Sequence, residues 1–440
     1  MSTKKRILNI LFWSVISAAF IGPGTITTAA SSGASFGTGL LWALVFSTLA
    51  CIVLQEAASR ISITTGSNLG QSIAEHYGST SAKRSVLLLV PAAIITGAAA
   101  YEMGNMLGAV EGIKLLFDIP SYVLVLIIAT VAIIILAIPS LKIVSTILGM
   151  MVVIMGVVFL LTAIMVKPDF GEIIKGAFIP SLPGPGAGTL VLALIGTTIV
   201  PYNLFLGSGL SAKGQSMKEM RFGLFTAIML GGIFSMAVLL TGAAINGSFS
   251  FNALSAVLEQ KMGISGKYLL AFGLFAAGFT SAVTAPLATA VTLKSIFGYN
   301  SKKSWDTGSR RFRATWLIIV FTGTLFASLD IKPVPAIILA QALNGFLLPF
   351  VSIFLYIVII KRDPKHTKNT LLSNILMLIV IYVTLILGIN SAVRALLRIF
   401  AYDPGDNPIY LVITSVAALI IVLIIAAKTG NHKPGKRNSN

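Results

Sequence analysis

The fold is decided by the run Phe20-Ile21-Gly22-Pro23-Gly24-Thr25-Ile26-Thr27-Thr28, which lies in the middle of the first long apolar segment, residues 8–35. Proline has no N–H and collides with the preceding turn, so a helix through Pro23 must kink or break. In the hydrocarbon of a membrane, broken backbone is tolerated where it is buried in protein or lines a cavity. The run therefore indicates either a plain proline kink or an unwound helix that forms a binding site.

A matching break occurs later in the chain, at Gly196-Thr197-Thr198-Ile199-Val200-Pro201-Tyr202-Asn203. Interrupted segments at corresponding positions of two halves point to the binding site of transporters built from inverted repeats. The first break is in the first apolar segment and the second is in the sixth, so the two helices enter the membrane from opposite sides. We therefore predict inverted five-helix repeats over residues 8–166 and 187–360, followed by two extra helices over residues 370–427.

The composition is that of a polytopic membrane protein. Of the 440 residues, 56% are hydrophobic and 10% are charged, whereas a soluble domain carries roughly 25% charged residues. A helix needs about 20 apolar residues to cross the hydrocarbon. We predict an all-α protein with one transmembrane domain, residues 1–427, and 12 spans, or 11 if one segment is interfacial. The apolar segments are residues 8–30, 39–60, 86–117, 121–141, 143–166, 187–211, 221–246, 267–297, 314–330, 333–360, 370–392 and 408–427.

The basic residues set the orientation and account for the net charge of +18. With the N-terminus inside, 24 of the 32 lysines and arginines lie in inner loops, as the positive-inside rule requires. This distribution predicts a multi-pass plasma-membrane protein with both termini and a basic tail, residues 428–440, in the cytoplasm. It also explains the charge by contact with the bilayer, so no nucleic-acid partner is expected.

Several classes of protein are excluded by what the sequence lacks. The loops are short and contain no phosphate-binding Gly-x-x-x-x-Gly-Lys-Ser/Thr motif, so the chain is not expected to be an enzyme or to use a cofactor. Uphill transport would have to use a gradient, with a proton or sodium as coupling ion. The single cysteine, Cys51, rules out a disulfide framework, and all three histidines (His76, His366 and His432) lie in loops or the tail.

Three polar residues in the predicted spans are candidates for coupling. Glu102 and Asn105 are three residues apart and share one face of a helix. A carboxylate inside a membrane segment is costly and usually functional, so the pair predicts either a proton site or a structural hydrogen bond. Glu56 lies four residues before Arg60, which fits either a plain ion pair at the interface or a coupling role.

The two breaks supply neutral groups for a substrate. Carbonyls freed at a break can bind a cation, and the N–H groups that open the next half-helix can bind a carboxylate. Hard divalent ions normally recruit carboxylates, so the sequence specifies no metal ligand set. Gln341 and Asn344 share a helix face and fit either a vestibule or helix–helix hydrogen bonding. The candidate substrate residues are Gly22, Pro23, Gly24, Thr25, Thr28, Thr197, Val200, Tyr202, Asn203 and Gln341.

These motifs together resemble the Nramp family of metal transporters, collinearly over residues 8–360. The resemblance implies the LeuT-type fold and secondary transport of a divalent metal cation. It rests on Gly22–Thr28 continuing to Gly33-Ala34-Ser35-Phe36-Gly37, on Leu54-Gln55-Glu56-Ala57-Ala58-Ser59-Arg60 with Thr65-Gly66, on Lys167-Pro168-Asp169-Phe170 with Pro180-Ser181-Leu182-Pro183-Gly184, on Val200-Pro201-Tyr202-Asn203-Leu204-Phe205-Leu206, and on Gln341 with Leu348-Pro349-Phe350.

The departures from the family motifs concern the metal ligands. Where the family has Asp-Pro-Gly-Asn, this chain has Gly22 and Thr25 at the Asp and Asn positions. Where the family has Met-Pro-His-Asn, it has Val200 and Tyr202 at the Met and His positions. Of two acidic residues of the family's third helix, one falls on Glu102 and the other on Asn105. Comparison with the family thus implies that selection of manganese or iron by soft ligands is altered or lost.

Three functions stay open at this point. The first is transport of a divalent cation, partly hydrated, through freed carbonyls and the hydroxyls of Thr25, Thr197 and Thr198. The second is transport of a small organic solute such as an amino acid, with its carboxylate at the amides of residues 22–25. The third is a non-transporting sensor or scaffold, against which the paired breaks argue. The sequence favours no particular oligomeric state.

Overall fold

The structure is a computed structural model that is helical over most of the part it describes, and that part contains no strand. Of the first predicted span, the residues before 21 lie outside the described part, apart from Trp13. The described residues are 13, 21–77, 83–138, 142–211, 216–298, 302–329, 331–362, 371–399 and 408–430.

The helices follow the apolar segments that the sequence shows. Each segment from residue 39 onward coincides with a helix whose ends are shifted by a few residues, and segment 187–211 is divided into α9 and α10. The helices are α2 Pro23–Phe36, α3 Leu41–Thr65, α4 Leu69–Tyr77, α5 Lys83–Lys114, α6 Ser121–Ala137, α7 Lys142–Val166, α8 Phe170–Phe178, α9 Ala187–Thr198, α10 Pro201–Leu210, α11 Met217–Gly242, α12 Phe251–Met262, α13 Ile264–Phe297, the short 3-10 turn η1 Lys302–Trp305, α14 Arg310–Ala327, α15 Pro333–Arg362, α16 Leu371–Ile399 and α17 Pro408–Gly430.

Eight helical stretches in the described part are long and apolar enough to cross a membrane. The predicted spans at residues 121–141 and 143–166 correspond to α6, Ser121–Ala137, and α7, Lys142–Val166. The eight long stretches are Leu41–Thr65, Lys83–Lys114, Ala187–Gly209, Met217–Gly242, Ile264–Phe297, Pro333–Lys361, Leu371–Arg394 and Ile409–Thr429.

The loops contain short helices that the sequence analysis did not predict. α8 begins after Asp169, whose carboxylate accepts a hydrogen bond from the Glu172 amide at 2.9 Å. α12 begins after Ser250, whose hydroxyl accepts one from the Ala253 amide at 3.0 Å. Both are N-caps of the ordinary kind. The short loops are therefore ordered by capping, and no soluble domain is inserted among the described residues.

Both proline-containing runs begin a helix. α2 starts at Pro23, after Gly22 in an extended conformation (φ −118°, ψ −174°). α9 ends at Thr198, Ile199 and Val200 leave the helical region, and α10 starts at Pro201. Proline suits the first helical position, where its missing N–H would have no helical partner. The second run is therefore a true break, as predicted, whereas the residues before Ile21, apart from Trp13, lie outside the described part.

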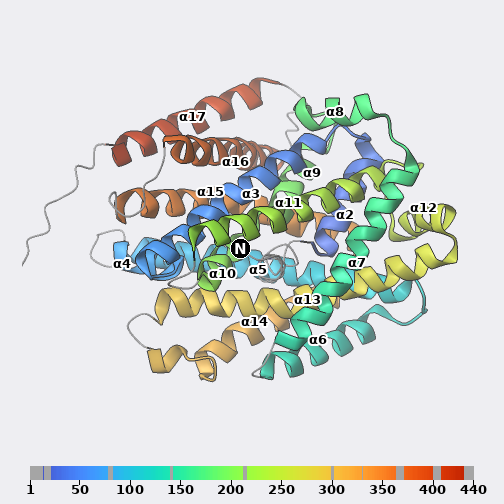
Figure 1. Cartoon of the computed structure of the whole chain (residues 1–440), viewed down its shortest axis with the longest axis horizontal. Coiled ribbons are helices and arrows are strands. Elements are labelled where there is room, and N and C mark those ends of the chain that lie inside the picture. Colours follow the sequence, from blue (N-terminus) through green and yellow to red (C-terminus); the bar gives the residue numbers. More distant parts are fainter. Residues whose placement is uncertain are drawn as a thin grey trace, which may run out of the picture.

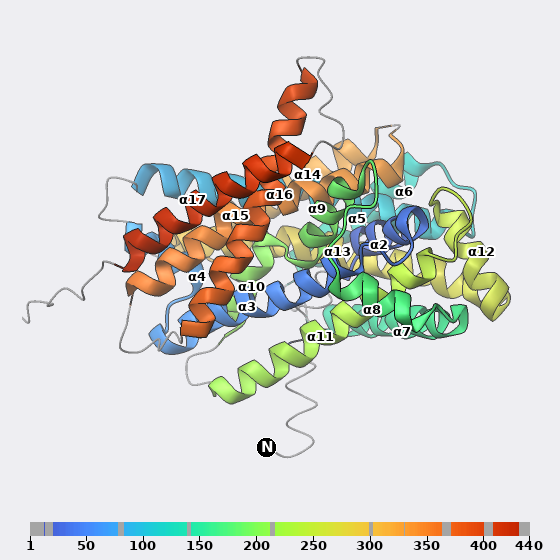
Figure 2. The ribbon, with the colours of Figure 1, turned by 90° about the horizontal axis from the view of Figure 1, so that it is seen from above.

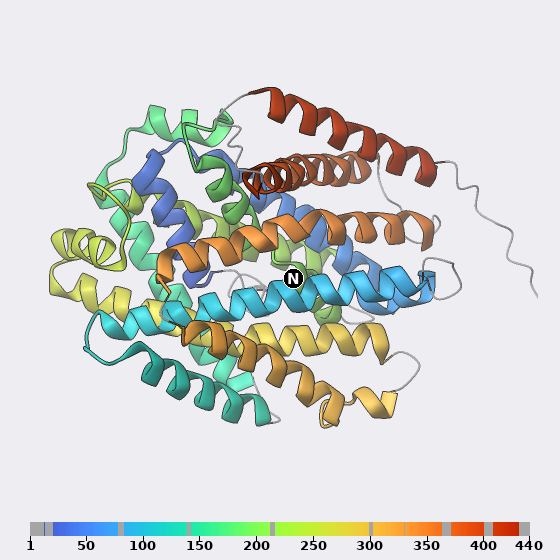
Figure 3. The same ribbon diagram turned by 180° about the vertical axis from the view of Figure 1, so that it is seen from behind.

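The long helices form a bundle around α5. Seen from behind, α5 lies between α15 on one side and α13 with α14 on the other (Figure 3). α16 and α17 lie at one edge of the bundle and α6 at the opposite edge (Figure 1). The view from above shows α17 lying across α15 and α16, and α7 and α8 on the far side (Figure 2). The half-helices α2, α9 and α10 are thereby enclosed by longer helices.

Glycines let α9 and α15 meet backbone to backbone. A β-carbon added to Gly196 of α9 would lie 2.0 Å from the carbonyl oxygen of Gln341, and one added to Gly345 of α15 would lie 2.3 Å from that of Leu192. Real β-carbons never approach so closely, so only glycine fits either position. Small residues allow such contacts between membrane helices. α9 is thus fixed against α15, which carries Gln341.

Candidate substrate site

Two threonines join the half-helices at the first and second breaks. Thr25 of α2 and Thr197 of α9 are both buried, and their hydroxyl oxygens are 2.8 Å apart. The phenol of Tyr101, on α5, donates to the Thr197 carbonyl oxygen at 3.4 Å. Two residues selected from different halves of the sequence therefore meet in space, 172 positions apart.

Gln341 faces the start of α2. It lies on α15 and is fully buried, and a β-carbon added to Gly24 would lie 2.3 Å from its Nε2 atom. Neither Nε2 nor Oε1 of Gln341 has a hydrogen-bond partner among the described residues. Buried amides are nearly always hydrogen-bonded, so this side chain is a group that a substrate or water can bind.

The start of α10 forms the other wall of the site. The Tyr202 ring meets the Tyr101 ring edge to face, with ring centroids 5.9 Å apart. The side chain of Asn203 is buried and its amide has no partner within the protein. The Asn203 carbonyl oxygen accepts a hydrogen bond from Gln55 Nε2 at 2.9 Å, which ties α10 to α3.

Helix ends of both polarities meet here. α2 and α10 begin at the site, and no side chain caps either start. Their first N–H groups have no partner within the helix and carry a partial positive charge. α9 ends at the site, and its last carbonyls carry the opposite partial charge. The breaks therefore supply donors and acceptors without any charged side chain.

A buried carboxylate lies next to this cluster. Asn105 Nδ2 donates to Glu102 Oε2 at 3.4 Å, and both side chains are buried in α5. A β-carbon added to Gly22 would lie 3.9 Å from Asn105 Oδ1 and 3.1 Å from the hydroxyl of Ser281, on α13. Glu102 is the only carboxylate that is fully buried among the described residues. It is connected to the first break through Asn105.

The remaining predicted substrate residues have local partners or positions. The Thr28 hydroxyl donates to the Gly24 carbonyl, one turn back along α2. The Thr198 hydroxyl donates to the Leu194 carbonyl at 2.9 Å and accepts from Ser47 at 3.1 Å. Val200 is buried in the link between α9 and α10. Thr198 therefore faces α3 rather than Thr25.

Glu56 lies in a charge cluster away from the breaks. It binds Arg221 of α11 through Oε1, at 2.7 Å to Nη2 and 2.8 Å to Nε. The predicted pair with Arg60 is present at 3.4 Å but is the longer of the two contacts. Arg60 also donates to Ser373 of α16 at 3.2 Å. The cluster thus connects α3, α11 and α16.

Two residues at the site, Tyr101 and Ser281, and one in the Glu56 cluster, Arg221, were not selected from the sequence. Tyr101 and Ser281 lie in long apolar helices, and only the fold brings them to the two breaks. Arg221 starts an apolar segment, where a basic residue normally anchors a helix to the interface. For Tyr101 alone a signal existed, because it adjoins the membrane carboxylate Glu102.

The comparisons with known proteins decide the family. The family model for natural resistance-associated macrophage protein-like (Nramp) proteins matches residues 14–394. The chain belongs to the Nramp family. Curated Nramp relatives include the divalent metal cation transporter MntH of Caldanaerobacter subterraneus, 26% identical over 85% of this chain and 90% of its own length. The MntH protein of Deinococcus radiodurans is 26% identical over 82% and 83%. These relatives are named as transporters and not as enzymes.

Solved structures show that the Nramp chain has the LeuT-type fold that the resemblance implied. The manganese transporter of Eremococcus coleocola superposes with a TM-score of 0.70 at 20% identity, covering 96% of this chain and 93% of its own. A nucleobase-cation-symport-1 family transporter superposes with a TM-score of 0.58 at 15% identity, covering 97% and 93%. The chain is therefore an all-α, multi-pass membrane protein.

The Nramp chain carries no obvious cluster of strong metal ligands in its described part. No group of three or more His, Cys, Asp or Glu side chains there is placed to hold a metal ion. The groups that converge on the breaks are hydroxyls, amides and backbone, with the Glu102 carboxylate behind them. Any cation bound here would be held by neutral oxygen atoms.

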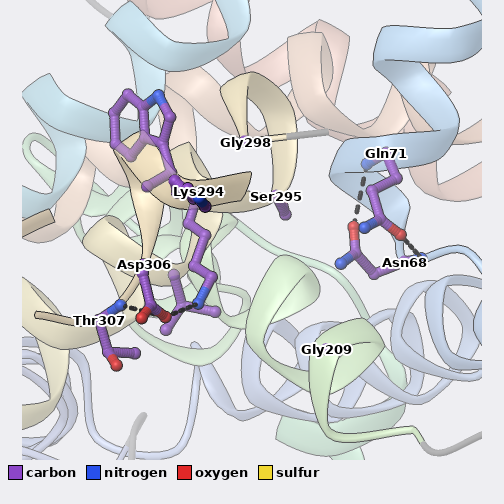
Figure 4. A pocket seen from close by; sticks show the side chains of 11 residues that line it. Asn68, Gln71, Gly209, Lys294, Ser295, Gly298, Asp306 and Thr307 are labelled. Carbon is purple, nitrogen blue, oxygen red and sulfur yellow. Dashed lines mark hydrogen bonds and ion pairs between the residues drawn. The ribbon is translucent and has the colours of Figure 1, made fainter. Parts of the chain in front are cut away.

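A cavity of about 590 Å³ lies at the far end of α10. Lys294 of α13 and Asp306 form an ion pair on one wall, with Nζ 3.6 Å from the carboxylate (Figure 4). On the opposite wall Asn68 and Gln71 bond each other through side chains and backbone, at 2.9 and 3.1 Å. Charged side chains line this cavity, whereas the groups that converge on the breaks are neutral.

Proposed function

We propose that this Nramp-family chain is a secondary active transporter of a divalent cation that keeps part of its water. The site would be the junction of α2, α9, α10 and α15. Support comes from the relatives, which are named as divalent metal cation transporters, and from one feature of the site. That feature is the buried carboxylate of Glu102 beside the first break.

Glu102 carries the argument because a charge in an apolar interior requires a partner. An unpaired buried carboxylate is strongly unfavourable. No lysine or arginine forms an ion pair with Glu102 among the described residues, and its Oε1 has no hydrogen-bond partner there. A cation near Gly22 would supply the opposite charge, with Asn105 between the two.

The ligands available to this cation are hard and neutral. They are the hydroxyls of Thr25 and Thr197, Oε1 of Gln341 and the carbonyls at the end of α9. Oxygen ligands suit magnesium, calcium and manganese, whereas soft sulfur ligands select among transition metals. Magnesium in particular keeps several waters when it binds. We therefore expect weak discrimination among these divalent ions, in contrast to a site with a thioether and a carboxylate.

The same carboxylate gives a route for coupling. Either a proton or a cation can neutralise Glu102, and exchange of one for the other would link the two movements. Glu56 is less suited to this role because two arginines already balance its charge. We therefore propose the proton as the coupling ion and Glu102, with Asn105, as the residues that carry it.

A second candidate, transport of an organic zwitterion such as an amino acid, rests on the donors at the site. The N–H groups in the first turn of α2 and the Nε2 group of Gln341 suit a carboxylate but are of no use to a bare cation. Tyr202 and Tyr101 would then border the side chain of the solute.

Flux measurements on the purified protein in liposomes distinguish the two. The assay would compare uptake of manganese, magnesium and calcium with uptake of an amino acid panel, against liposomes with T197V protein. Metal uptake that T197V reduces, with no amino acid uptake, supports the first proposal. Amino acid uptake without metal uptake rejects it. If G22D/T25N gains manganese uptake while the native chain shows none, the fold can transport a metal but the native substrate is not a metal, and the first proposal is rejected.

The orientation and boundaries are also proposed here. We place both termini in the cytoplasm of a plasma-membrane protein, with repeats at residues 8–166 and 187–360, so that the cavity at Lys294 opens inward. A cysteine-free C51S chain with a new cysteine at Gly308 tests this with a membrane-impermeant thiol reagent. Labelling of Gly308→Cys in intact cells would place residue 308 outside the cell and contradict the proposed orientation.

A further inference from the structure

A second cavity, of about 560 Å³, lies between α9, α15 and α16, on the opposite side of α15 from α5. Its walls are mainly apolar, with Leu339, Leu343 and Phe346 from α15 and Leu192 from α9. Asn390 and Arg394 of α16 also line it. None of these residues belongs to the junction of the two breaks, so the cavity is separate from the proposed substrate site.

The cavity opens to the apolar surface of the bundle at one end of a membrane span. Leu339, one of its lining residues, is 67% exposed, which in a spanning helix means contact with lipid chains. Arg394 follows the apolar segment 370–392 and lies near the end of α16, Leu371–Ile399, so we expect the guanidinium where hydrocarbon gives way to head groups. Figure 1 shows α16 between α15 and α17, near one edge of the bundle.

Glycines keep part of the cavity open. A β-carbon added to Gly188, in the first turn of α9, would meet no atom within 4 Å, and the same holds for Gly186. Other glycines of α9 and α15 are required by close helix contacts, whereas Gly188 faces space. Glycine in a helix costs about 1 kcal/mol relative to alanine, and no contact explains Gly188.

We propose that this cavity binds an anionic phospholipid, with an acyl chain along α15 and the phosphate on Arg394. The charge of the cavity fits this ligand, because Arg394 contributes a positive charge to the lining that the structure describes. Arginine binds phosphate in a bidentate manner. Asn390 is 8% exposed and its Oδ1 accepts from Arg394 Nε at 3.4 Å, which orients the guanidinium. A bound chain would fill the space beside Gly188.

Occupancy would affect the substrate site through two helices. Ala342, which lines the cavity, adjoins Gln341, and Leu192 packs its backbone against Gly345. The lipid would therefore stabilise the present contact between α9 and α15. This inference does not depend on which solute the chain carries.

The test compares the thermal unfolding of the protein in nanodiscs of phosphatidylcholine with and without phosphatidylglycerol. We expect phosphatidylglycerol to raise the midpoint for the native chain and to raise it much less for R394Q. G188L keeps the charge and places a larger side chain in the space beside Gly188, where an added β-carbon would meet no atom within 4 Å, so it should lose the rise in the same way. The matched controls are K332Q, an exposed cation outside the cavity, and G308L, an exposed glycine with no neighbour within 4 Å; both should keep the full rise.

Three results would overturn the proposal. The first is an equal rise for R394Q and the native chain, and the second is a full rise for G188L. The third is an equal rise produced by inorganic phosphate in detergent, because this would identify a soluble anion as the ligand. Native mass spectrometry provides an independent readout, with a retained phosphatidylglycerol expected on the native chain and lost from both cavity variants.

Discussion

Gly108 of α5 faces Pro23 so closely that a β-carbon added to Gly108 would lie 1.9 Å from the Pro23 β-carbon. The proline that starts α2 is therefore seated on a glycine of the central helix. Both atoms belong to rigid groups, since the pyrrolidine ring cannot rotate away and α5 is held on both sides.

G108A should therefore displace the start of α2 and weaken transport. Overpacking of this kind typically costs about 1–3 kcal/mol of stability, and Thr25 would move away from Thr197. The measurements are initial uptake rate and thermal unfolding in detergent. Gly104, one turn earlier, is the control, because its β-carbon would meet nothing nearer than 3.7 Å; equal losses for G104A and G108A would contradict the close contact.

Glu102→Gln should reduce the pH dependence of uptake. If Glu102 exchanges a proton for the cation, a glutamine that cannot ionise uncouples the two, so uphill uptake is lost while downhill flux can persist. The measurement is uptake at several external pH values, with and without an imposed proton gradient. N105A should alter the pH profile less, since the carboxylate is kept. An unchanged profile in Glu102→Gln would end the proposal that this residue carries the proton.

T25V and T197V should be non-additive. The two hydroxyls share one hydrogen bond, at 2.8 Å, and a typical hydrogen bond contributes about 0.5–1.5 kcal/mol. Either valine removes it, so the second adds little further loss of stability. Substrate affinity should fall about tenfold or more in each, as measured by binding or half-saturation of uptake. Full additivity in the thermal unfolding of the double variant would show that the two hydroxyls do not interact.

Removing Glu56 should cost more stability than removing Arg221. Arg60 is almost fully buried, with a side chain 5% exposed, whereas that of Arg221 is 56% exposed. E56Q leaves the buried Arg60 without its carboxylate, and a buried charge that loses its partner is costly. R221Q leaves the Glu56–Arg60 pair intact and loses only an exposed contact, which is worth about 0–1 kcal/mol. Thermal unfolding of both variants in one detergent makes the comparison, and the reverse order would contradict it.

The positions of the long helices were predicted well from the sequence, and the reason is physical. In a membrane, helix length and apolarity are imposed by the bilayer, so segments such as 221–246 and 333–360 mark helices directly. Proline at position 201 cannot continue a helix, and the chain breaks there as expected. The short helices α4, α8 and α12 were missed because a few caps in a polar loop give no comparable signal.

The sequence anticipated part of the geometry of the candidate site, whereas the binding roles of its residues stay predictions. Thr25, Thr197 and Gln341 do converge, because the breaks and their neighbours were identifiable. Which hydroxyl faces inward was not: Thr197 meets Thr25, whereas Thr198, the next residue, bonds Ser47. Successive residues are rotated by about 100° around a helix. Sequence spacing gives this rotation but does not give the direction in which the helix as a whole faces its neighbours. Arg221 was missed as the partner of Glu56 because it lies 165 positions away in the sequence, and only the fold brings the two together.

The glycine contact between α9 and α15 has a mechanical consequence. With Gly196 against Gln341 and Gly345 against Leu192, neither helix can roll over the other without separating their backbones. If α9 tilts during transport, the middle of α15 must then move with it, so that the two helices behave as one rigid body. The amide of Gln341 would keep its position relative to Thr197 in both end conformations of the transport cycle. A solute would therefore contact the same pair of side chains when it binds and when it is released.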